Sequence, residues 1–377
     1  IMASRDAYTI YVSNYSPYSI KALAILGWAG IDVSVKRSNL VTRERVLKKR
    51  TGKTMVPMLC RGAWAINDST RIARFAIERS ARPLLPAPAG AGAGDEARGL
   101  NALCWLLEEF ADEWVARWFI HERWHIEENR EALAKWVGEE LVWGLPVVSE
   151  KIGNFAAGTI ARQTAKAGAS PMNSGALANT RDRTLAALEA ILLDGGGYLF
   201  GPQPTVADFG LYGPIEQYRR DPAGAGRLSR YPAVCGWLMR MRSAEVPDAS
   251  PEKLEIGLEE AREGRALEQL RPLFEEFGST YWRVLIENHE VASRAERAER
   301  AEVTLGDGVR FSFAPSGYGI KRLEEVLALL DAVYNHSPQL LESLGGLQVA
   351  LREGFSSLGR ASAGRELLAR FPSLPER

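Results

Sequence analysis

The sequence predicts an α/β domain at the N-terminus, an all-α domain after it, and an extra, mostly helical region that contains a β-hairpin. Three observations predict this order. Strand-like and helix-like patterns alternate over the first ~80 residues, a segment rich in Pro, Gly and Ala follows at 83–94, and residues 97–241 show only helical patterns and loops. A chain of 377 residues exceeds one typical domain, so two or three domains are expected.

The same patterns set the expected boundaries. We expect four segments: an α/β domain at 1–85, a linker at 86–98, a helical domain at 99–248, and a C-terminal region at 249–377 with its hairpin near 302–314.

The α/β domain opens with a strand and a helix joined by a short polar segment. Tyr8 to Val12 is rich in β-branched and aromatic residues, and apolar residues recur at helical spacing from Ile20 onward. The tetrapeptide Ser16-Pro-Tyr-Ser19 therefore lies at a helix N-terminus, where unpaired N–H groups favour an anion. Because serines stand where a redox motif carries its two cysteines, we expect no thiol–disulfide exchange here.

A second strand and a hairpin complete the α/β domain. Apolar and polar residues alternate over 31–36, a polar and basic segment follows at 39–53, and two short apolar runs at 55–60 and 63–66 predict the hairpin. Asp68-Ser69-Thr70 then caps a helix, so the order is βαβ followed by ββα.

Pro57 interrupts the first run of this hairpin. Since a central strand does not tolerate proline, we expect a cis Val56–Pro57 bond at a special site. The backbone of Val56 would then be able to pair with an extended, peptide-like ligand.

The helical domain and the C-terminal region each contain distinct signals. A helix predicted from Leu100 to about Glu128 is dense in aromatic residues, and Thr205 with Asp208 forms a capping box. Ser250-Pro251 predicts a helix start, and alternation around Gly306-Asp-Gly308 predicts the hairpin.

Composition excludes several classes of function. Lys plus Arg and Asp plus Glu both total 47, so no net field favours nucleic acid or an anionic membrane, and no apolar run reaches the ~18 residues of a membrane span. The N-terminal residues lack the pattern of a signal peptide, and three widely spaced cysteines indicate reduced core thiols, so a cytoplasmic protein is expected. His121 and His125 lie one helical turn apart without further ligands, so no metal site is expected.

These motifs together resemble the glutathione S-transferase superfamily in its serine-type form. The resemblance rests on Ser16-Pro-Tyr, Val56-Pro57, the acidic-Ser pair Asp68-Ser69, and Thr205-Val-Ala-Asp208, and it covers residues 7–241. It implies a thioredoxin-like N-terminal domain that binds glutathione as a co-substrate and a helical C-terminal domain. The remaining residues resemble the extension of some long bacterial proteins of this superfamily.

The resemblance also implies roles for individual residues. Ser16 would donate a hydrogen bond to the glutathione thiolate, with Tyr15 and Ser19 as rivals for this role. Lys53, Val56, Pro57, Asp68 and Ser69 would bind the rest of the tripeptide, although Asp68 stands where Glu or Gln is usual and Met55 where Lys or Gln is usual. The electrophile would contact the aromatic helix, for which the candidates are Trp114, Trp118, His121 and Trp124.

Three functions follow from the resemblance. The first is a glutathione transferase that attacks a small apolar electrophile, the second is a non-catalytic binding or scaffold protein, and the third is a glutathione-dependent ether-cleaving or dehalogenating enzyme. By analogy with the superfamily, a homodimer is expected, with no nucleic-acid or membrane partner.

Overall fold

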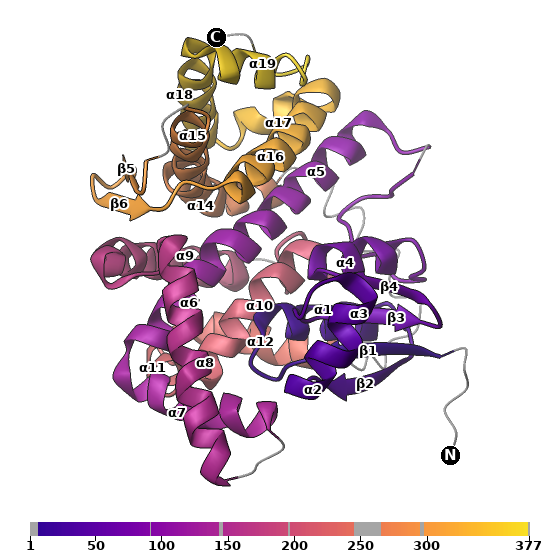
Figure 1. Cartoon of the computed structure of the whole chain (residues 1–377). Helices are drawn as coiled ribbons and strands as arrows, with labels where there is room; N and C mark the ends of the chain where they lie inside the picture. Colours follow the sequence, from indigo (N-terminus) through magenta and orange to yellow (C-terminus); the bar gives the residue numbers. More distant parts are fainter. Residues whose placement is uncertain are drawn as a thin grey trace.

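The structure is a computed structural model that describes residues 7–90, 92–142, 146–194, 197–244, 265–294 and 298–375. In Figure 1 the N-terminal domain lies against the helices of the second domain, and the C-terminal region lies above both at the top of the view.

The N-terminal domain is built on a four-stranded mixed sheet. Its strands have the order β2-β1-β3-β4, in which β1 runs parallel to β2 and antiparallel to β3. Strands and helices alternate as the sequence predicts; they are β1 (Tyr8–Val12), α1 (Pro17–Trp28), β2 (Val33–Arg37), β3 (Met58–Arg61), β4 (Trp64–Asn67) and α4 (Ser69–Ile77). The mixed sheet with α1 and α4 is the thioredoxin-like fold that the sequence predicts, and helix α1 also packs against α10 (Val206–Arg220) of the second domain.

The polar segment between β2 and β3 is helical, which the sequence pattern did not indicate. It comprises α2 (Leu40–Thr42), the π-helical turn η1 (Arg43–Leu47) and α3 (Lys48–Thr51). Asn39 caps its start by accepting a hydrogen bond from the Thr42 amide at 2.8 Å. Of the residues in these three pieces, Leu47 alone is fully buried. The segment therefore lacks the repeated apolar residues by which a helix is identified from sequence.

The second domain is helical throughout its described residues. Its first helix begins at Asp95, earlier than predicted, and ends at His125, where Ile126 is extended. This continuous helical stretch consists of α5 (Asp95–Phe110), the π-helical turn η2 (Ala111–Val115) and α6 (Ala116–His125). The remaining helices are α7 (Glu127–Leu141), α8 (Pro146–Lys166), η3 (Pro171–Asn173), α9 (Ser174–Asp194), α10 (Val206–Arg220), α11 (Pro222–Leu228) and α12 (Pro232–Ala244).

The C-terminal region is mostly helical and contains the predicted hairpin. Val303 pairs with Phe311 across two antiparallel strands, which confirms the hairpin, whereas the helix start predicted at Ser250-Pro251 lies outside the described residues. The elements are α14 (Arg265–Ser279), α15 (Tyr281–Ala292), β5 (Ala301–Thr304), β6 (Arg310–Phe313), α16 (Gly317–His336), α17 (Gln339–Glu342), α18 (Gly346–Arg360) and α19 (Ser362–Leu368).

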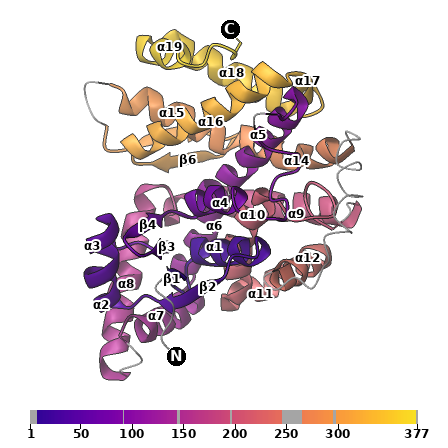
Figure 2. The ribbon, with the colours of Figure 1, turned by 90° about the vertical axis from the view of Figure 1, so that its right-hand side faces the viewer.

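One continuous core joins the C-terminal region to the second domain. The ring of Phe110 contacts Phe277 at a centroid distance of 6.1 Å, and the ring of Trp114 contacts Phe311 at 5.1 Å. Both views show α16 lying beside α5, and the two helices are in contact (Figures 1 and 2). The C-terminal region is therefore packed as part of the molecule. None of the helices in the described ranges is long and apolar enough to cross a bilayer.

Candidate functional site

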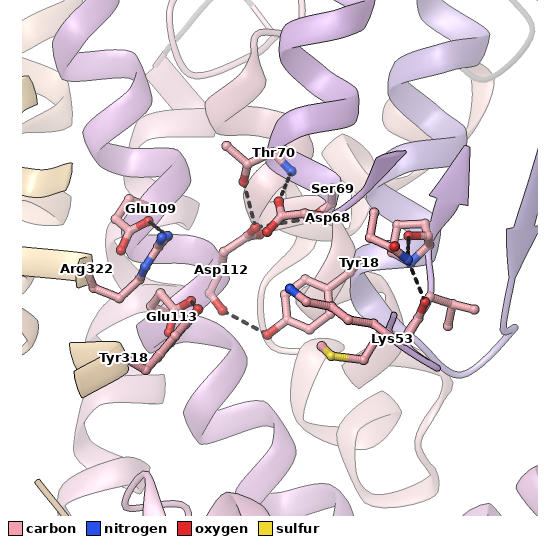
Figure 3. A pocket seen from close by; sticks show the side chains of 14 residues that line it. Tyr18, Lys53, Asp68, Ser69, Thr70, Glu109, Asp112, Glu113, Tyr318 and Arg322 are labelled. Carbon is pink, nitrogen blue, oxygen red and sulfur yellow. Dashed lines mark hydrogen bonds and ion pairs between the residues drawn. The ribbon is translucent and has the colours of Figure 1, made fainter. Parts of the chain in front are cut away.

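Three parts of the chain meet around a cavity of about 160 Å³ at the N-terminus of α4. The N-terminal domain forms one side, the junction of α5 and η2 forms the floor, and α16 of the C-terminal region forms the opposite side (Figure 3). Ligand pockets usually measure about 300–1,000 Å³. This cavity is therefore suited to a group the size of one amino acid rather than to a whole tripeptide.

The five residues predicted to bind a tripeptide all line this cavity. They are Lys53, Val56, Pro57, Asp68 and Ser69. The Val56–Pro57 peptide bond is cis, as the sequence predicted. The side-chain amide of Asn67 donates to the carbonyl of Met55 at 3.0 Å and so holds the loop that precedes this bond.

The N-terminus of α4 is held by Asp68 and opens toward the cavity. Asp68 has a positive φ of 89°, and its carboxylate accepts from the amides of Thr70 at 2.9 Å and Arg71 at 3.4 Å. Its own helix therefore uses this carboxylate as an N-cap. Ser69 is buried behind it, and its hydroxyl donates to Asp112 at 3.3 Å.

Buried charges connect the two domains beneath the cavity. The ammonium of Lys21, on α1, contacts the carboxylates of Glu108 and of Asp112, the latter at 2.7 Å. Burial raises the pKa of Asp112 to about 7, although the positive charge of Lys21 opposes this effect and the negative charge of Glu108 adds to it. Asp112 lies in the π-helical turn η2, and turns of this kind are frequent at functional sites.

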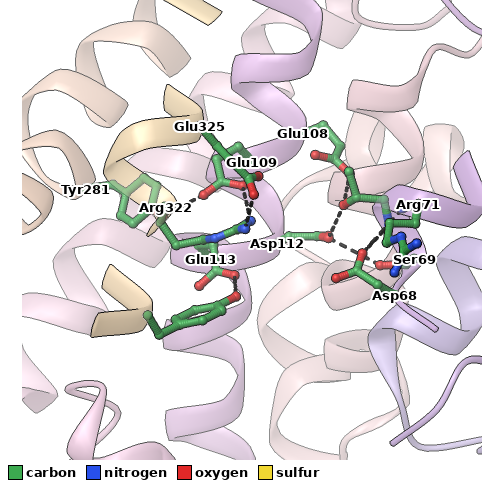
Figure 4. A network of polar contacts seen from close by, with 12 residues as sticks. Asp68, Ser69, Arg71, Glu108, Glu109, Asp112, Glu113, Tyr281, Arg322 and Glu325 are labelled. Carbon is green, nitrogen blue, oxygen red and sulfur yellow. Dashed lines mark hydrogen bonds and ion pairs between the residues drawn. The ribbon is translucent and has the colours of Figure 1, made fainter. Parts of the chain in front are cut away.

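Helix α16 borders the acidic end of the cavity. Arg322 pairs with Glu109 at 3.1 Å (Figure 4), and the hydroxyl of Tyr318 donates to Glu113. Burial raises the pKa of both glutamates, while Arg322 lowers both. The residues that line the cavity include four carboxylates and two cationic side chains, Lys53 and Arg322.

The three hydroxyl residues proposed to contact a thiolate do not line this cavity. Ser16 is half-buried and its hydroxyl caps α1 by accepting from the Ser19 amide at 3.2 Å, while the Ser19 hydroxyl accepts from the Ser13 amide. The ring of Tyr15 stacks on Trp136. Tyr18, in the same tetrapeptide, does line the cavity, where its hydroxyl donates to the carbonyl of Asp112 at 3.1 Å.

The four aromatic candidates for a substrate pocket lie in the interior. Trp114 and Trp118 are fully buried, and Trp124 and His121 are nearly so. Trp118 packs edge-on against Tyr218, and burial together with the neighbouring His125 lowers the pKa of His121 to about 4. None of the four lines the cavity, so their role in substrate binding stays a prediction. Within the part of the chain that the structure describes, no group of three or more His, Cys, Asp or Glu is arranged to hold a metal.

The sequence prediction missed the side of the site formed by α5, η2 and α16. The acidic residues Glu108, Glu109, Asp112 and Glu113 recur at helical spacing within a largely buried helix, which was an available signal. Tyr318 and Arg322 lie about 200 residues further along the chain, where no local pattern distinguishes them from a solvated helix face.

Two protein-family profiles match the sequence. Residues 10–84 match the family described as glutathione S-transferase, N-terminal domain, and residues 174–240 match glutathione S-transferase, C-terminal domain. No curated protein matches the sequence.

Several solved structures resemble this one at low sequence identity. The β-etherase LigF from Sphingobium sp. strain SYK-6 is 18% identical with a TM-score of 0.43, and the match covers 68% of this chain and 98% of that one. A glutathione S-transferase I bound with lactoylglutathione is also 18% identical, with a TM-score of 0.41 and coverage of 63% and 98%. Glutaredoxin 2 from Salmonella typhimurium, in complex with glutathione, is 14% identical, with a TM-score of 0.38 and coverage of 64% and 95%.

The family matches agree with the architecture of the chain. The first match spans the mixed sheet with α1 and α4, and the second spans α9 to α12 of the helical domain. Residues 10–84 and 174–240 therefore match the N-terminal and C-terminal domains of glutathione S-transferases.

Proposed function

We propose that the protein is a glutathione transferase and that the cavity at α4 receives the γ-glutamyl end of glutathione. The observation that carries this proposal is that the cis Val56–Pro57 bond, Lys53 and the N-terminus of α4 at Ser69 all border one cavity. A carboxylate at the start of α4 is favoured by the helix dipole. An extended ligand leaving the cavity pairs with the backbone of Val56.

The thiol of this ligand lies at the N-terminus of α1 in the proposed mechanism. There the Ser16 hydroxyl and the dipole of α1 stabilise the thiolate over the thiol. A hydrogen bond to a charged acceptor contributes about 1.5–3 kcal/mol, which lowers the thiol pKa by about one to two units. The thiolate then attacks an apolar electrophile held beside the helical domain.

The test is the thiol pKa of bound glutathione and the rate of conjugation. Ser16→Ala should raise the pKa of the bound thiol by about one to two units, as measured by the absorbance of the thiolate at different pH values. It should also lower the rate of conjugation with a chloronitrobenzene substrate by about ten-fold or more. Asn39→Ala is the control, because Asn39 caps α2 through a similar side-chain bond away from the cavity. An unchanged thiol pKa in Ser16→Ala would remove Ser16 from the mechanism.

A second function, glutathione binding without transfer, is favoured by one observation. The Ser16 hydroxyl already caps its own helix and does not line the cavity. Calorimetry with glutathione, combined with the conjugation assay, separates the two functions. Binding without any conjugation across several electrophile classes would support the second function.

We also propose that the protein is cytoplasmic and forms a homodimer. Because α16 covers one face of α5, a homodimer would use other surfaces of the helical domain. Static light scattering of the full chain measures the molar mass and so tests whether the protein is a dimer.

A further inference from the structure

The equal totals of acidic and basic residues conceal an uneven distribution of charge along the chain. Eight of the 18 residues from 36 to 53 are Lys or Arg and one, Glu44, is acidic, so this segment carries a net charge of +7 and the rest of the chain carries −7. Seven of the eight basic side chains are exposed, and Arg43 is half-buried. The expectation of no membrane partner rests on the balance over the whole chain, to which this segment is a local exception.

Most of this segment is the helical stretch α2–η1–α3, which packs on one face of the sheet. Leu47 is buried against Met58 of β3, so the stretch has an inward and an outward side. Exposed residues recur in pairs four positions apart, at 40–41, 44–45 and 48–49, and residues at this spacing share one side of a helix. Figure 2 shows α2 and α3 at the outer edge of the molecule. The outward side, formed by these six residues, is therefore accessible to a partner.

The outward side has an apolar end and a basic end. Leu40 and Val41 are 41% and 44% exposed although both are apolar. Arg45 and then Lys49 follow at helical spacing, and both are exposed. Apolar side chains beside a row of basic ones are typical of helices that lie at a membrane surface.

Protection of the sheet edge does not account for this charge. Strand β2 lies at the edge of the sheet, where Lys36 and Arg37 discourage pairing with another chain. The basic residues of the outward side lie on helical backbone instead. Glu44 pairs with Lys48 at 2.7 Å, and no ion pair with a described residue engages the other two basic side chains of this side. Their charge is therefore available to an anionic partner.

We propose that the outward side of α2–η1–α3 docks on a membrane that contains anionic lipids. Negatively charged headgroups attract Arg45 and Lys49, while Leu40 and Val41 enter the boundary between headgroups and acyl chains. The phosphate backbone of a nucleic acid would match the charges but would leave both apolar side chains without a partner. A bilayer surface matches both ends of the outward side.

Docking in this way also positions the cavity at α4. Lys53 and Met55 follow the last residue of α3 by two and four positions, and both line the cavity. The docked protein therefore holds the cavity close to the membrane surface. The inference goes beyond the proposed function and does not depend on the binding of glutathione.

Binding of the full chain to lipid vesicles tests the inference. Co-sedimentation compares vesicles of phosphatidylcholine with vesicles that also contain phosphatidylserine at about 30%, each in about 0.1 M and about 0.5 M NaCl. We expect about ten-fold tighter binding to the anionic vesicles, and about five-fold weaker binding to them at the higher salt concentration because salt screens the charges. Equal binding to both kinds of vesicle, or binding that salt does not weaken, overturns the inference.

Charge reversal assigns the binding to the outward side. The double variant with Arg45→Glu and Lys49→Glu should bind the anionic vesicles about ten-fold more weakly than the wild type. The control carries Lys321→Glu and Arg352→Glu, which make the same change in net charge at exposed residues of α16 and α18. Equal weakening in the two double variants shows that only the total charge matters and overturns the inference.

A variant of the apolar end separates a membrane from a nucleic acid as the partner. The change of Leu40→Ser together with Val41→Ser should weaken binding to the anionic vesicles about five-fold, because two apolar side chains no longer leave water. Fluorescence anisotropy measures binding of a labelled DNA duplex to the same proteins. Unchanged vesicle binding in this variant, or binding of the wild type to the duplex without binding to the anionic vesicles, overturns the inference. Circular dichroism confirms that every variant is folded.

Discussion

Replacing Lys21 with Met tests whether the buried charges between the first two domains hold the molecule together. Lys21 is 1% exposed, and its ammonium lies between the carboxylates of Glu108 and Asp112. Met has a similar length and no charge, so Lys21→Met leaves two acidic side chains buried without their cation. Removing one partner of a buried ion pair typically costs about 3–5 kcal/mol in the free energy of unfolding.

The expected loss depends on pH. Burial raises the pKa of Asp112 to about 7, from about 4 in the unfolded chain, so between these pH values the folded state holds a proton that the unfolded state has lost. The contribution of Asp112 to stability is therefore greatest at low pH and falls as the pH rises to 7. In Lys21→Met the pKa of Asp112 rises further, so this fall continues above pH 7 at about 1.4 kcal/mol per pH unit.

The assay is urea unfolding followed by far-ultraviolet circular dichroism at pH 6 and pH 8. The difference in the free energy of unfolding between the wild type and Lys21→Met should be larger at pH 8 than at pH 6, by about 1–1.5 kcal/mol. Lys48→Met is the matched control: Lys48 pairs with Glu44 on the surface, where the side chains are 57% and 59% exposed, and the pair contributes less than about 1 kcal/mol. A loss in Lys21→Met no larger than in Lys48→Met, or one equal at both pH values, would refute this reasoning.

Two further predictions concern the packing of the helical domain. Gly138→Ala should destabilise the protein by about 1–3 kcal/mol or more, because the new Cβ would lie 1.9 Å from the carbonyl oxygen of Ser149 where α7 meets α8. Gly158→Ala, on α8, is the control and should stabilise the protein by about 0.5–1 kcal/mol. Equal unfolding temperatures would contradict the close contact between α7 and α8. Asp208→Ala should cost about 3 kcal/mol or more, because the fully buried carboxylate accepts from the Trp237 indole at 3.2 Å and from two backbone amides. Thermal unfolding measures this loss, and a change below about 1 kcal/mol would show that these donors find other acceptors.

Local signals in the sequence predicted the elements whose cause is local. The β-branched run at Tyr8–Val12 and the Gly306-Asp-Gly308 turn each depend on neighbouring residues, and the structure contains β1 and the β5–β6 hairpin there. The cis bond before Pro57 was predictable because proline conflicts with a central strand. Asp208 also holds Thr205 as the capping box predicted, through bonds of 2.9 Å from the Thr205 amide and hydroxyl.

Long-range contacts account for what the sequence did not predict. The burial of Trp114 depends on Phe311, almost 200 residues later in the chain, so its aromatic character alone could not separate a core position from a pocket wall. The cavity presents a similar case, because Asp112 is held by Lys21 and Ser69, which lie far from it in the sequence.

By itself, the sequence determined the order of the domains, the resemblance to the glutathione S-transferase superfamily, and one side of the candidate site, from Lys53 to Ser69. Those features depend on residues close together in the chain, whose propensities and spacing can be read directly. Only the tertiary structure decided that α16 forms the other side and that Asp112 lines the cavity. The physical reason is that charge pairing and burial depend on distances in space between segments that the sequence separates.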